Sequence, residues 1–262
     1  MPDYTAITFA LSDHVAHITI SRPEAANSLN RDLATDLMNV SLHCHEDPDI
    51  RAVVITGEGR LFCAGGDLKS FSAADDISSY IRETATFLHV AMSRFSRMDA
   101  PLIAAVNGAA AGAGMSIACA SDLVLAGESA RFTMAYTRAG LTPDGSSTYF
   151  LPRIVGLRRA LELTLTNRVL TAQEAADWGI VTRVVPDDEL LAEAAALATE
   201  LAQGPTGAFG ATKRLIHSGW RESLETQMEH ESVAIAHQAS SPEGREGVAA
   251  FLEKRPPGFL SI

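Results

Sequence analysis

The stretch PLIAAVNGAAAGAGMSIACASD, residues 101–122, decides the fold class. It begins with a short apolar run, residues 102–106, of the length expected for a buried strand. Asn107-Gly108 then predicts a turn, small residues continue to Gly114, and the following residues fit a buried helix. A glycine-rich turn that enters a helix leaves backbone N–H groups free, and such groups attract negative charge. The segment therefore predicts a site for an oxyanion rather than for a metal ion.

A membrane span is the competing interpretation of the same stretch, because residues 102–120 contain only Asn107 and Ser116 as clearly polar members. The run is interrupted by Asn-Gly, rich in alanine and glycine rather than leucine, and flanked by aspartates instead of basic residues. These features favour a buried strand and helix in a soluble protein, so we expect no membrane partner.

Composition limits the function classes. The chain has 262 residues, 47% of them hydrophobic and 20% charged, which is typical of a globular protein. Its 21 basic and 32 acidic residues give a net charge of −11, which argues against a nucleic-acid partner. An anionic small molecule bound at a local basic patch remains compatible with this charge.

The cysteines indicate a reducing compartment. Cys44, Cys63 and Cys119 are odd in number and have no paired spacing, so we interpret them as reduced thiols in a cytoplasmic protein. No CxxC or HExxH spacing is present, and we expect no bound metal. The first residues also lack the basic start and apolar core of a signal peptide.

The remaining pattern predicts an α/β fold. Residues 6–10 and 15–20 read as a strand hairpin, and Asn30 is a candidate cap for the next helix. Further strands are expected at 52–56, 123–125 and 181–185, with a helix at 80–97. Helical periodicity dominates after residue 156, at 157–166, 172–178, 190–201, 208–218 and 222–238. Alternating strands and helices predict a largely parallel sheet.

A second glycine-rich turn, FCAGGDL at residues 62–68, follows the strand at 52–56. Two such turns after two parallel strands would face each other where open α/β sheets bind ligands. One N–H from each turn would then make a two-donor oxyanion hole. The alternative is that these glycines only permit tight turns and close packing.

Several motifs in order resemble the signatures of the crotonase family, the enoyl-CoA hydratase/isomerase superfamily. They are RPEAANSLN (residues 22–30), FCAGGDL (62–68), AAVNGAAAGAGMSIACASDLVLA (104–126), ARFTMAYTRAGLTPDG (130–145), WGIVTRVV (178–185) and REGVAAFLEKRPPGF (245–259). The resemblance covers nearly the whole chain. It implies a crotonase-like ββα spiral core over residues 1–200 and a helical C-terminal trimerisation region over residues 201–262.

The resemblance also implies a ligand and an assembly. The ligand would be an acyl-CoA thioester, with no cofactor beyond the coenzyme A that is part of the substrate. The chain would form a homotrimer or a dimer of trimers. By position, the thioester oxygen would be held by the N–H groups of Gly66 and Ala113, where Ala113 replaces a glycine common in the family. The residues that would contact the CoA portion are Ala25, Ala64, Gly65, Asp67, Leu68 and Lys254.

The reaction depends on which acids the site contains. Hydratases of this superfamily use two glutamates to manage a water, and the matching positions here hold Ser116 and Tyr136, neither of which is a carboxylate base. Asp144 remains, in a stretch that resembles ring-1,2-epoxyphenylacetyl-CoA isomerases and Δ3,Δ2-enoyl-CoA isomerases, where the matching aspartate is the acid/base. Without the resemblance, Pro143-Asp144-Gly145 is simply a turn signal. We therefore expect an enzyme of this family, with isomerase activity favoured over hydratase activity.

The sequence is also compatible with three further functions. Residues 148–184 resemble 4-chlorobenzoyl-CoA dehalogenase, in which the residue matching Asp144 is the nucleophile and the one matching His89 activates water. His89 and Tyr136, which matches that enzyme's tryptophan partner of the aspartate, are thus further candidate catalytic residues. The second function is that of a hydratase, and the third is that of a catalytically silent subunit that binds acyl-CoA.

Overall fold

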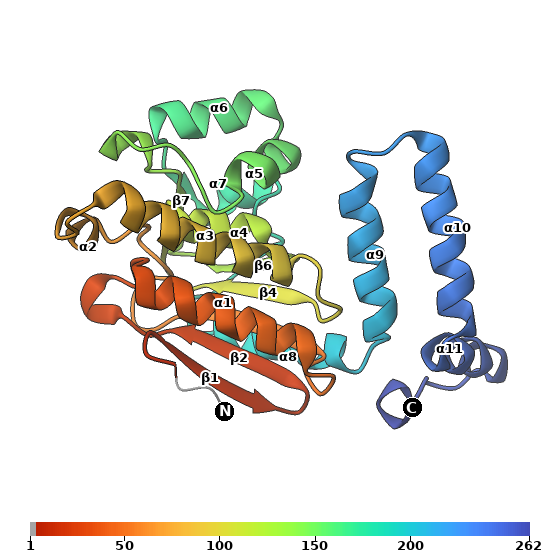
Figure 1. The fold of residues 1–262 in the computed structure, drawn as a ribbon. Coiled ribbons are helices and arrows are strands. Elements are labelled where there is room, and N and C mark those ends of the chain that lie inside the picture. The colour runs from red at the N-terminus through yellow and green to blue at the C-terminus, as the bar shows by residue number, and fades with distance from the viewer. Residues whose placement is uncertain (1–3) are drawn as a thin grey trace.

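The computed structural model describes residues 4–262 and contains two sheets (Figure 1). The larger sheet has the strand order β1-β2-β3-β4-β6-β9. Its strands are β1 (Ile7–Ser12), β2 (Val15–Ile20), β3 (Ala52–Gly57), β4 (Leu102–Val106), β6 (Leu123–Gly127) and β9 (Arg183–Val185). β1 and β2 form the expected antiparallel hairpin, and every other pair in this sheet is parallel.

Helices cover both faces of the larger sheet, which explains its continuous apolar strands. Along β3, Val53 and Ile55 join the core beneath α1 (Arg31–Glu46) and α3 (Ile77–Phe95). The alternate residues Ala52 and Val54 pack instead in a cluster with α8 (Leu190–Ala202). Figure 1 shows α1 and α3 side by side, and they are in direct contact.

The deciding stretch folds as strand, strand and helix. β4 is followed by β5 (Ala109–Ala111) and then by α4 (Ala113–Ala120). β5 belongs to a second sheet, with β7 (Arg131–Thr133) and β8 (Leu170–Thr171), which the sequence pattern did not predict. Three alanines carry no alternating pattern, so only their distant partners identify them as a strand. The stretch is no membrane span, and within residues 4–262 no helix is long and apolar enough to cross a membrane.

The other helices agree with the expected periodicity to within a few residues. They are α6 (Leu157–Thr166), α7 (Ala172–Asp177), α9 (Thr206–Gly219) and α10 (Leu224–Ser240). α3 begins earlier than expected because Asp76 caps its first turn by accepting from the N–H groups of Ser78 and Ser79. Periodicity missed α2 (Leu68–Ser72), α5 (Ser147–Val155) and α11 (Pro242–Glu253), and also the single turns η1 (Pro23–Ala25), η2 (Thr137–Ala139) and η3 (Phe259–Ser261).

The C-terminal helices α9 to α11 extend away from the sheet as a separate layer (Figure 1). α9 is attached to the core by Lys213, whose ammonium lies 2.6 Å from Asp122 and donates to the carbonyls of Phe95 and Ala100. Burial lowers the pKa of Lys213 and raises that of Asp122, although each partner opposes the shift of the other. α8, which packs on the larger sheet, ends at Ala202.

Asn30 is the N-cap of α1 and directly follows Leu29, which pairs with the Gly65–Asp67 turn. Its side-chain oxygen accepts from the Leu33 N–H at 2.9 Å, as the sequence predicted. Asn30→Ala removes this cap, and we expect the free energy of unfolding to fall by about 1 kcal/mol in urea titrations. Asn30→Ser keeps a capping oxygen without adding a charge beside Asp32, and it serves as the matched control. Equal stability of both variants would contradict the assignment.

Candidate active site

The two glycine-rich turns touch each other through Gly65 and Gly112. A Cβ placed on Gly65 would lie 3.2 Å from the carbonyl oxygen of Ala111, and one on Gly112 would lie 3.3 Å from the Gly65 Cα. Both residues have positive φ, +103° and +50° respectively. Side chains at these positions would therefore both strain the backbone and separate the turns.

The residues that follow these two glycines are Gly66 and Ala113, and both line one cavity of about 370 Å³. Ala113 is the first residue of α4, so its N–H has no acceptor within the helix. Within residues 4–262 neither of these N–H groups donates to another backbone group. Gly66 itself pairs with Leu29 in an isolated bridge, in which Leu29 N–H donates to the Gly65 carbonyl and Asp67 N–H to the Leu29 carbonyl. This bridge fixes the turn while leaving the Gly66 N–H free.

The cavity is mostly apolar and holds one carboxylate. Among its lining residues, all within the described chain, Asp144 is the only acid and Tyr136 the only other titratable group. Its apolar lining is formed by Leu29, Leu68, Phe71, Ile81, Ala85 and Leu141, among others. In the described residues no group of three or more His, Cys, Asp or Glu side chains is arranged to hold a metal ion. The cavity suits an apolar acyl group beside a single acid/base.

Asp144 lies at the end of a short chain of side-chain hydrogen bonds. The Tyr136 hydroxyl donates to Asp144 Oδ1 at 2.7 Å, and Ser116 Oγ lies 2.9 Å from the same hydroxyl. Burial and the adjacent Asp144 carboxylate raise the pKa of Tyr136 far above its ordinary value. Tyr136 therefore stays protonated at neutral pH and can donate continuously to Asp144.

Gly145 allows the Asp144 turn to pack against the helices. A Cβ at Gly145 would meet the Ser116 Cβ at 2.8 Å and Leu88 Cδ2 at 3.1 Å, and its φ is +59°. The Gly145 N–H donates to His89 Nε2 at 3.1 Å, so this His89 nitrogen acts as an acceptor. His89 and Asp144 both line a second cavity of about 390 Å³, on the side of the turn that faces α3.

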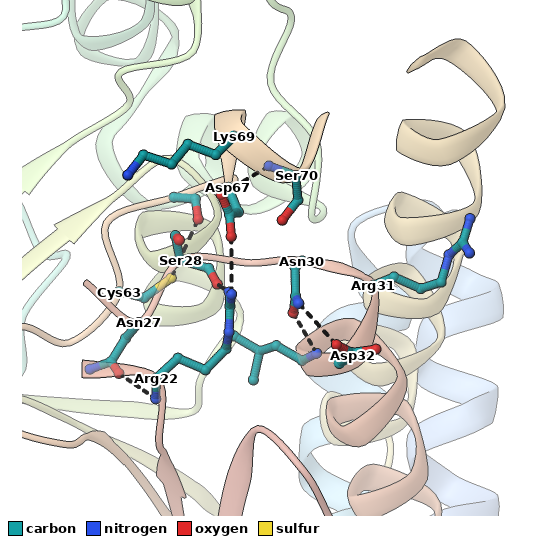
Figure 2. A network of polar contacts seen from close by, with 12 residues as sticks. Arg22, Asn27, Ser28, Asn30, Arg31, Asp32, Cys63, Asp67, Lys69 and Ser70 are labelled. Atoms are coloured by element: carbon teal, nitrogen blue, oxygen red, sulfur yellow. Dashed lines mark hydrogen bonds and ion pairs between the residues drawn. The ribbon is translucent and has the colours of Figure 1, made fainter. Parts of the chain in front are cut away.

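A largely buried ion pair between Arg22 and Asp67, drawn in Figure 2, directly follows the Gly65–Gly66 turn. The Arg22 guanidinium lies 3.0 Å from Asp67 Oδ2 and also donates to the Ser28 carbonyl. Asp67 caps α2 by accepting from the Ser70 N–H. Burial opposes ionisation of Asp67, but hydrogen bonds from Arg22 and Ser70 and the charge of Arg22 outweigh it and lower its pKa. Asn27 completes the network by accepting from the Arg22 N–H.

The structure brings some of the expected CoA-contacting residues together and separates others. Ala64, Gly65 and Leu68 line the cavity beside Gly66. Asp67 turns toward Arg22 instead, and Ala25 lies in η1 outside the cavity lining.

Lys254 is separated most clearly from the rest of the expected site. It ends α11, on the layer of C-terminal helices that lies away from the cavity (Figure 1).

Sequence reasoning missed the role of Arg22, which belongs to the RPEAANSLN motif but carried no predicted function. Its partner Asp67 is distant in the sequence, and no local periodicity links the two. The same holds for Leu29, whose bridge to Gly66 is a single residue pair outside the named strands. The only local signal for this role is the position of Arg22 directly before Pro23, in a loop made mainly of small residues.

The sequence and the fold both match those of known proteins. The sequence profile of enoyl-CoA hydratase/isomerase matches residues 11–261. The chain is 40% identical over 257 residues to a probable enoyl-CoA hydratase of Rhodobacter capsulatus, covering 98% of each.

This chain belongs to the enoyl-CoA hydratase/isomerase family. It is 38% identical over 250 residues to the 1,2-epoxyphenylacetyl-CoA isomerase of Escherichia coli, covering 94% of each. It is also 36% identical over 245 residues to a 4-chlorobenzoyl coenzyme A dehalogenase of Arthrobacter, covering 93% of this chain and 89% of that one. The solved structure of a putative enoyl-CoA hydratase/isomerase from Mycobacterium abscessus superposes with a TM-score of 0.92 at 33% identity, covering 97% of this chain and 99% of that one.

These matches confirm the expected crotonase superfamily and its α/β core with a helical C-terminal region. The protein is an acyl-CoA enzyme of this family. Relatives of similar identity are named hydratase, isomerase and dehalogenase, so family membership alone does not select the reaction.

The contact between the two turns gives a first test. In Gly65→Ala the new Cβ would press on the Ala111 carbonyl, so we expect turnover of an enoyl-CoA ester to fall by about 10²-fold, as for loss of one oxyanion donor. Gly156→Ala is the matched control, because Gly156 also has positive φ, +81°, but no atom within 4 Å of its Cβ position. Both variants should lose stability through backbone strain, whereas only Gly65→Ala should lose activity. Equal activity of the two would contradict a role for the contact.

The Arg22–Asp67 pair gives a pH-dependent test. Asp67→Asn keeps a capping side chain but loses the charge, and we expect it to destabilise the protein by about 2 kcal/mol at pH 7. Because folding lowers the pKa of Asp67, the stabilisation is complete above its unfolded value of about 3.9 and is lost as the pH falls below it. Urea titrations of wild type and variant should therefore differ by a constant amount from pH 5 to 8 and converge below about pH 4. A difference that persists unchanged at pH 3 would contradict this linkage.

Proposed function

We propose that the enzyme isomerises an enoyl-CoA or ring-epoxide acyl-CoA thioester, with Asp144 as the single acid/base. The observation that carries this proposal is the cavity itself, in which one carboxylate lies with two free backbone N–H groups among apolar side chains. A proton that is removed from one carbon and returned to another requires only one such group. A hydration mechanism that uses two carboxylates to bind and deprotonate water would need a second acid, and Asp144 is the only acid among the described residues that line this cavity.

The proposed reaction on a 3-enoyl-CoA proceeds in two proton transfers. Asp144 removes a proton from the carbon beside the thioester carbonyl, and the electrons of that C–H bond move into a dienolate with charge on the thioester oxygen. The N–H groups of Gly66 and Ala113 stabilise that oxygen without supplying an acid that would quench it. Protonated Asp144 then returns the proton to the γ-carbon, which yields the 2-enoyl-CoA and restores the carboxylate.

We further propose that the CoA portion leaves the cavity past Ala64, Gly65 and Leu68, toward Ala25. Asp67 would act on this region indirectly, through the Arg22 pair that supports the turn. The reaction uses no cofactor beyond the CoA of the substrate itself.

Lys254 ends α11, which belongs to the layer of C-terminal helices (Figure 1), and no residue of that layer lines the cavity. We propose that Lys254 contacts the CoA that is bound by another copy of the protein. The helices α9 to α11 expose many large apolar side chains, which supports association as a homotrimer or dimer of trimers. These side chains are Ile216, Leu224, Met228, Val233, Ile235, Val248, Phe251 and Leu252.

The role of Asp144 is tested by Asp144→Asn, which preserves the shape of the side chain. We expect isomerisation of 3-enoyl-CoA to fall by about 10²-fold to 10⁴-fold, because general acid–base catalysis contributes that much. Binding of a saturated acyl-CoA, measured by calorimetry, should be nearly unchanged. Unaltered turnover in the variant would exclude Asp144 as the base. Water addition to 2-enoyl-CoA by the wild type at a rate above the isomerisation would instead favour a hydratase.

A second candidate is nucleophilic displacement at Asp144, supported by the dehalogenase relative and by His89 beside the Asp144 turn. Single-turnover reaction of 4-chlorobenzoyl-CoA in heavy-oxygen water separates the two functions. A nucleophilic Asp144 would carry the label after hydrolysis of the aryl ester, whereas an acid/base Asp144 would not. Tight binding without turnover of any of these esters would indicate a silent acyl-CoA-binding subunit.

A further inference from the structure

We propose that Tyr136, itself held by Ser116, is a positioning residue that fixes the Asp144 carboxylate, so that one oxygen is anchored and the other exchanges the substrate proton. This inference rests on the proposed function of Asp144 and assigns a division of labour to its two oxygens. It also gives a role to Ser116, whose side chain is not an acid: Ser116 holds the Tyr136 hydroxyl in place.

The geometry of the carboxylate supports this division. Tyr136 donates to Oδ1 at 2.7 Å, and within residues 4–262 Oδ2 has no hydrogen-bond partner. Asp144 and Tyr136 both line the 370 Å³ cavity. A hydrogen bond to one oxygen restricts rotation of the carboxylate and leaves the other oxygen available to a substrate carbon acid.

Ser116 in turn restricts Tyr136. Ser116 is fully buried in α4, and its Oγ lies 2.9 Å from the Tyr136 hydroxyl, 3.1 Å from the Asp144 carbonyl and 3.2 Å from the Gly112 carbonyl. Because the tyrosine proton is directed at Asp144, the serine proton can be directed at the tyrosine oxygen. Ser116 thereby links the tyrosine to the same α4 terminus that presents the Ala113 N–H.

The hydrogen-bond chain also accommodates protonation of the anchored oxygen. If a proton resides on Oδ1, Asp144 donates to Tyr136, Tyr136 donates to Ser116, and Ser116 donates to the carbonyl of Gly112 or Asp144. Every hydroxyl keeps a partner in both states, so neither leaves a buried polar group unsatisfied. The chain can therefore hold Oδ1 in either of its protonation states, while Oδ2 exchanges the substrate proton.

The titratable neighbours of the Asp144 turn are few. Tyr136, the N-cap residue of η2, donates to the carboxylate, and His89 from α3 accepts from the Gly145 N–H. His89 contacts the backbone rather than the carboxylate, and its Nε2 is already occupied as an acceptor. The hydroxyl of Tyr136 is therefore the contact whose removal changes the carboxylate directly.

The test compares Tyr136→Phe, Ser116→Ala and the double variant over pH 4 to 9 with a 3-enoyl-CoA substrate. Tyr136→Phe should lower kcat by about 10-fold to 100-fold with little change in KM. It should also move the acidic limb of the kcat/KM profile to higher pH, because the ionised carboxylate loses a donor. Ser116→Ala should give a smaller effect in the same direction and add nothing in the Tyr136→Phe background.

The outcomes separate this inference from the proposed function. Tyr149→Phe is the matched control, since Tyr149 packs against Phe150 and Trp220 away from the carboxylate, and it should leave the profile unchanged. An unshifted acidic limb in Tyr136→Phe, or independent effects of the two substitutions, would overturn the positioning role even if Asp144→Asn is inactive. An inactive Tyr136→Phe beside an active Asp144→Asn would show instead that Tyr136 exchanges the proton itself. If Tyr136→Phe does not fold, an unshifted acidic limb in Ser116→Ala would overturn the proposal on its own.

Discussion

The site depends on the contact between the backbones of Gly65 and Gly112. Each residue has positive φ, and the absence of a side chain at each lets the two turns meet at van der Waals distance. The N–H groups of the next residues, Gly66 and Ala113, thereby enter one cavity without acceptors of their own. These donors require no side chain and carry no formal charge, so an apolar acyl group can lie beside them. The elements that surround the contact act to hold the two turns in place.

Three different interactions hold these turns. The first is covalent continuity with the parallel strands, since β4 leads through β5 into α4. The second is pairing of the second sheet, in which the Gly112 N–H donates to the Thr133 carbonyl. The third is the Arg22–Asp67 ion pair, which ties the loop before α1 to the start of α2 (Figure 2). Breaking one partner of a largely buried pair leaves an uncompensated charge next to the turn, so local stability and site geometry are coupled there.

The sequence was most informative where function imposes a local pattern. The strand and glycine-rich helix start around Asn107, the cap at Asn30 and the Gly145 turn each follow from residues that are near neighbours in the chain. The interactions that the sequence did not reveal join segments that are distant in the chain and carry no periodicity or motif of their own. β5 is three alanines, and its pairing with β7 becomes visible only when both are folded. Likewise, nothing near Arg22 indicates that Asp67 is its partner. Nothing near Lys254 indicates that α11 contributes no residue to the lining of the cavity.

The choice of serine at position 116 follows from the space and charge around Asp144. Ser116 is fully buried and touches both the Tyr136 hydroxyl and the Asp144 carbonyl, and the Gly145 turn packs directly on its Cβ. A carboxylate in its place would be buried near Asp144, where two like charges disfavour the ionisation of both. It would also remove the one hydroxyl, among residues 4–262, that lies within hydrogen-bond distance of the Tyr136 hydroxyl and can donate to it while Tyr136 donates to Asp144. Serine instead donates a hydrogen bond to the tyrosine oxygen without adding a negative charge. Asp144 thus remains the one carboxylate among the described residues that line the cavity. The arrangement favours chemistry that moves a single proton between two carbons over chemistry that must orient and deprotonate a water.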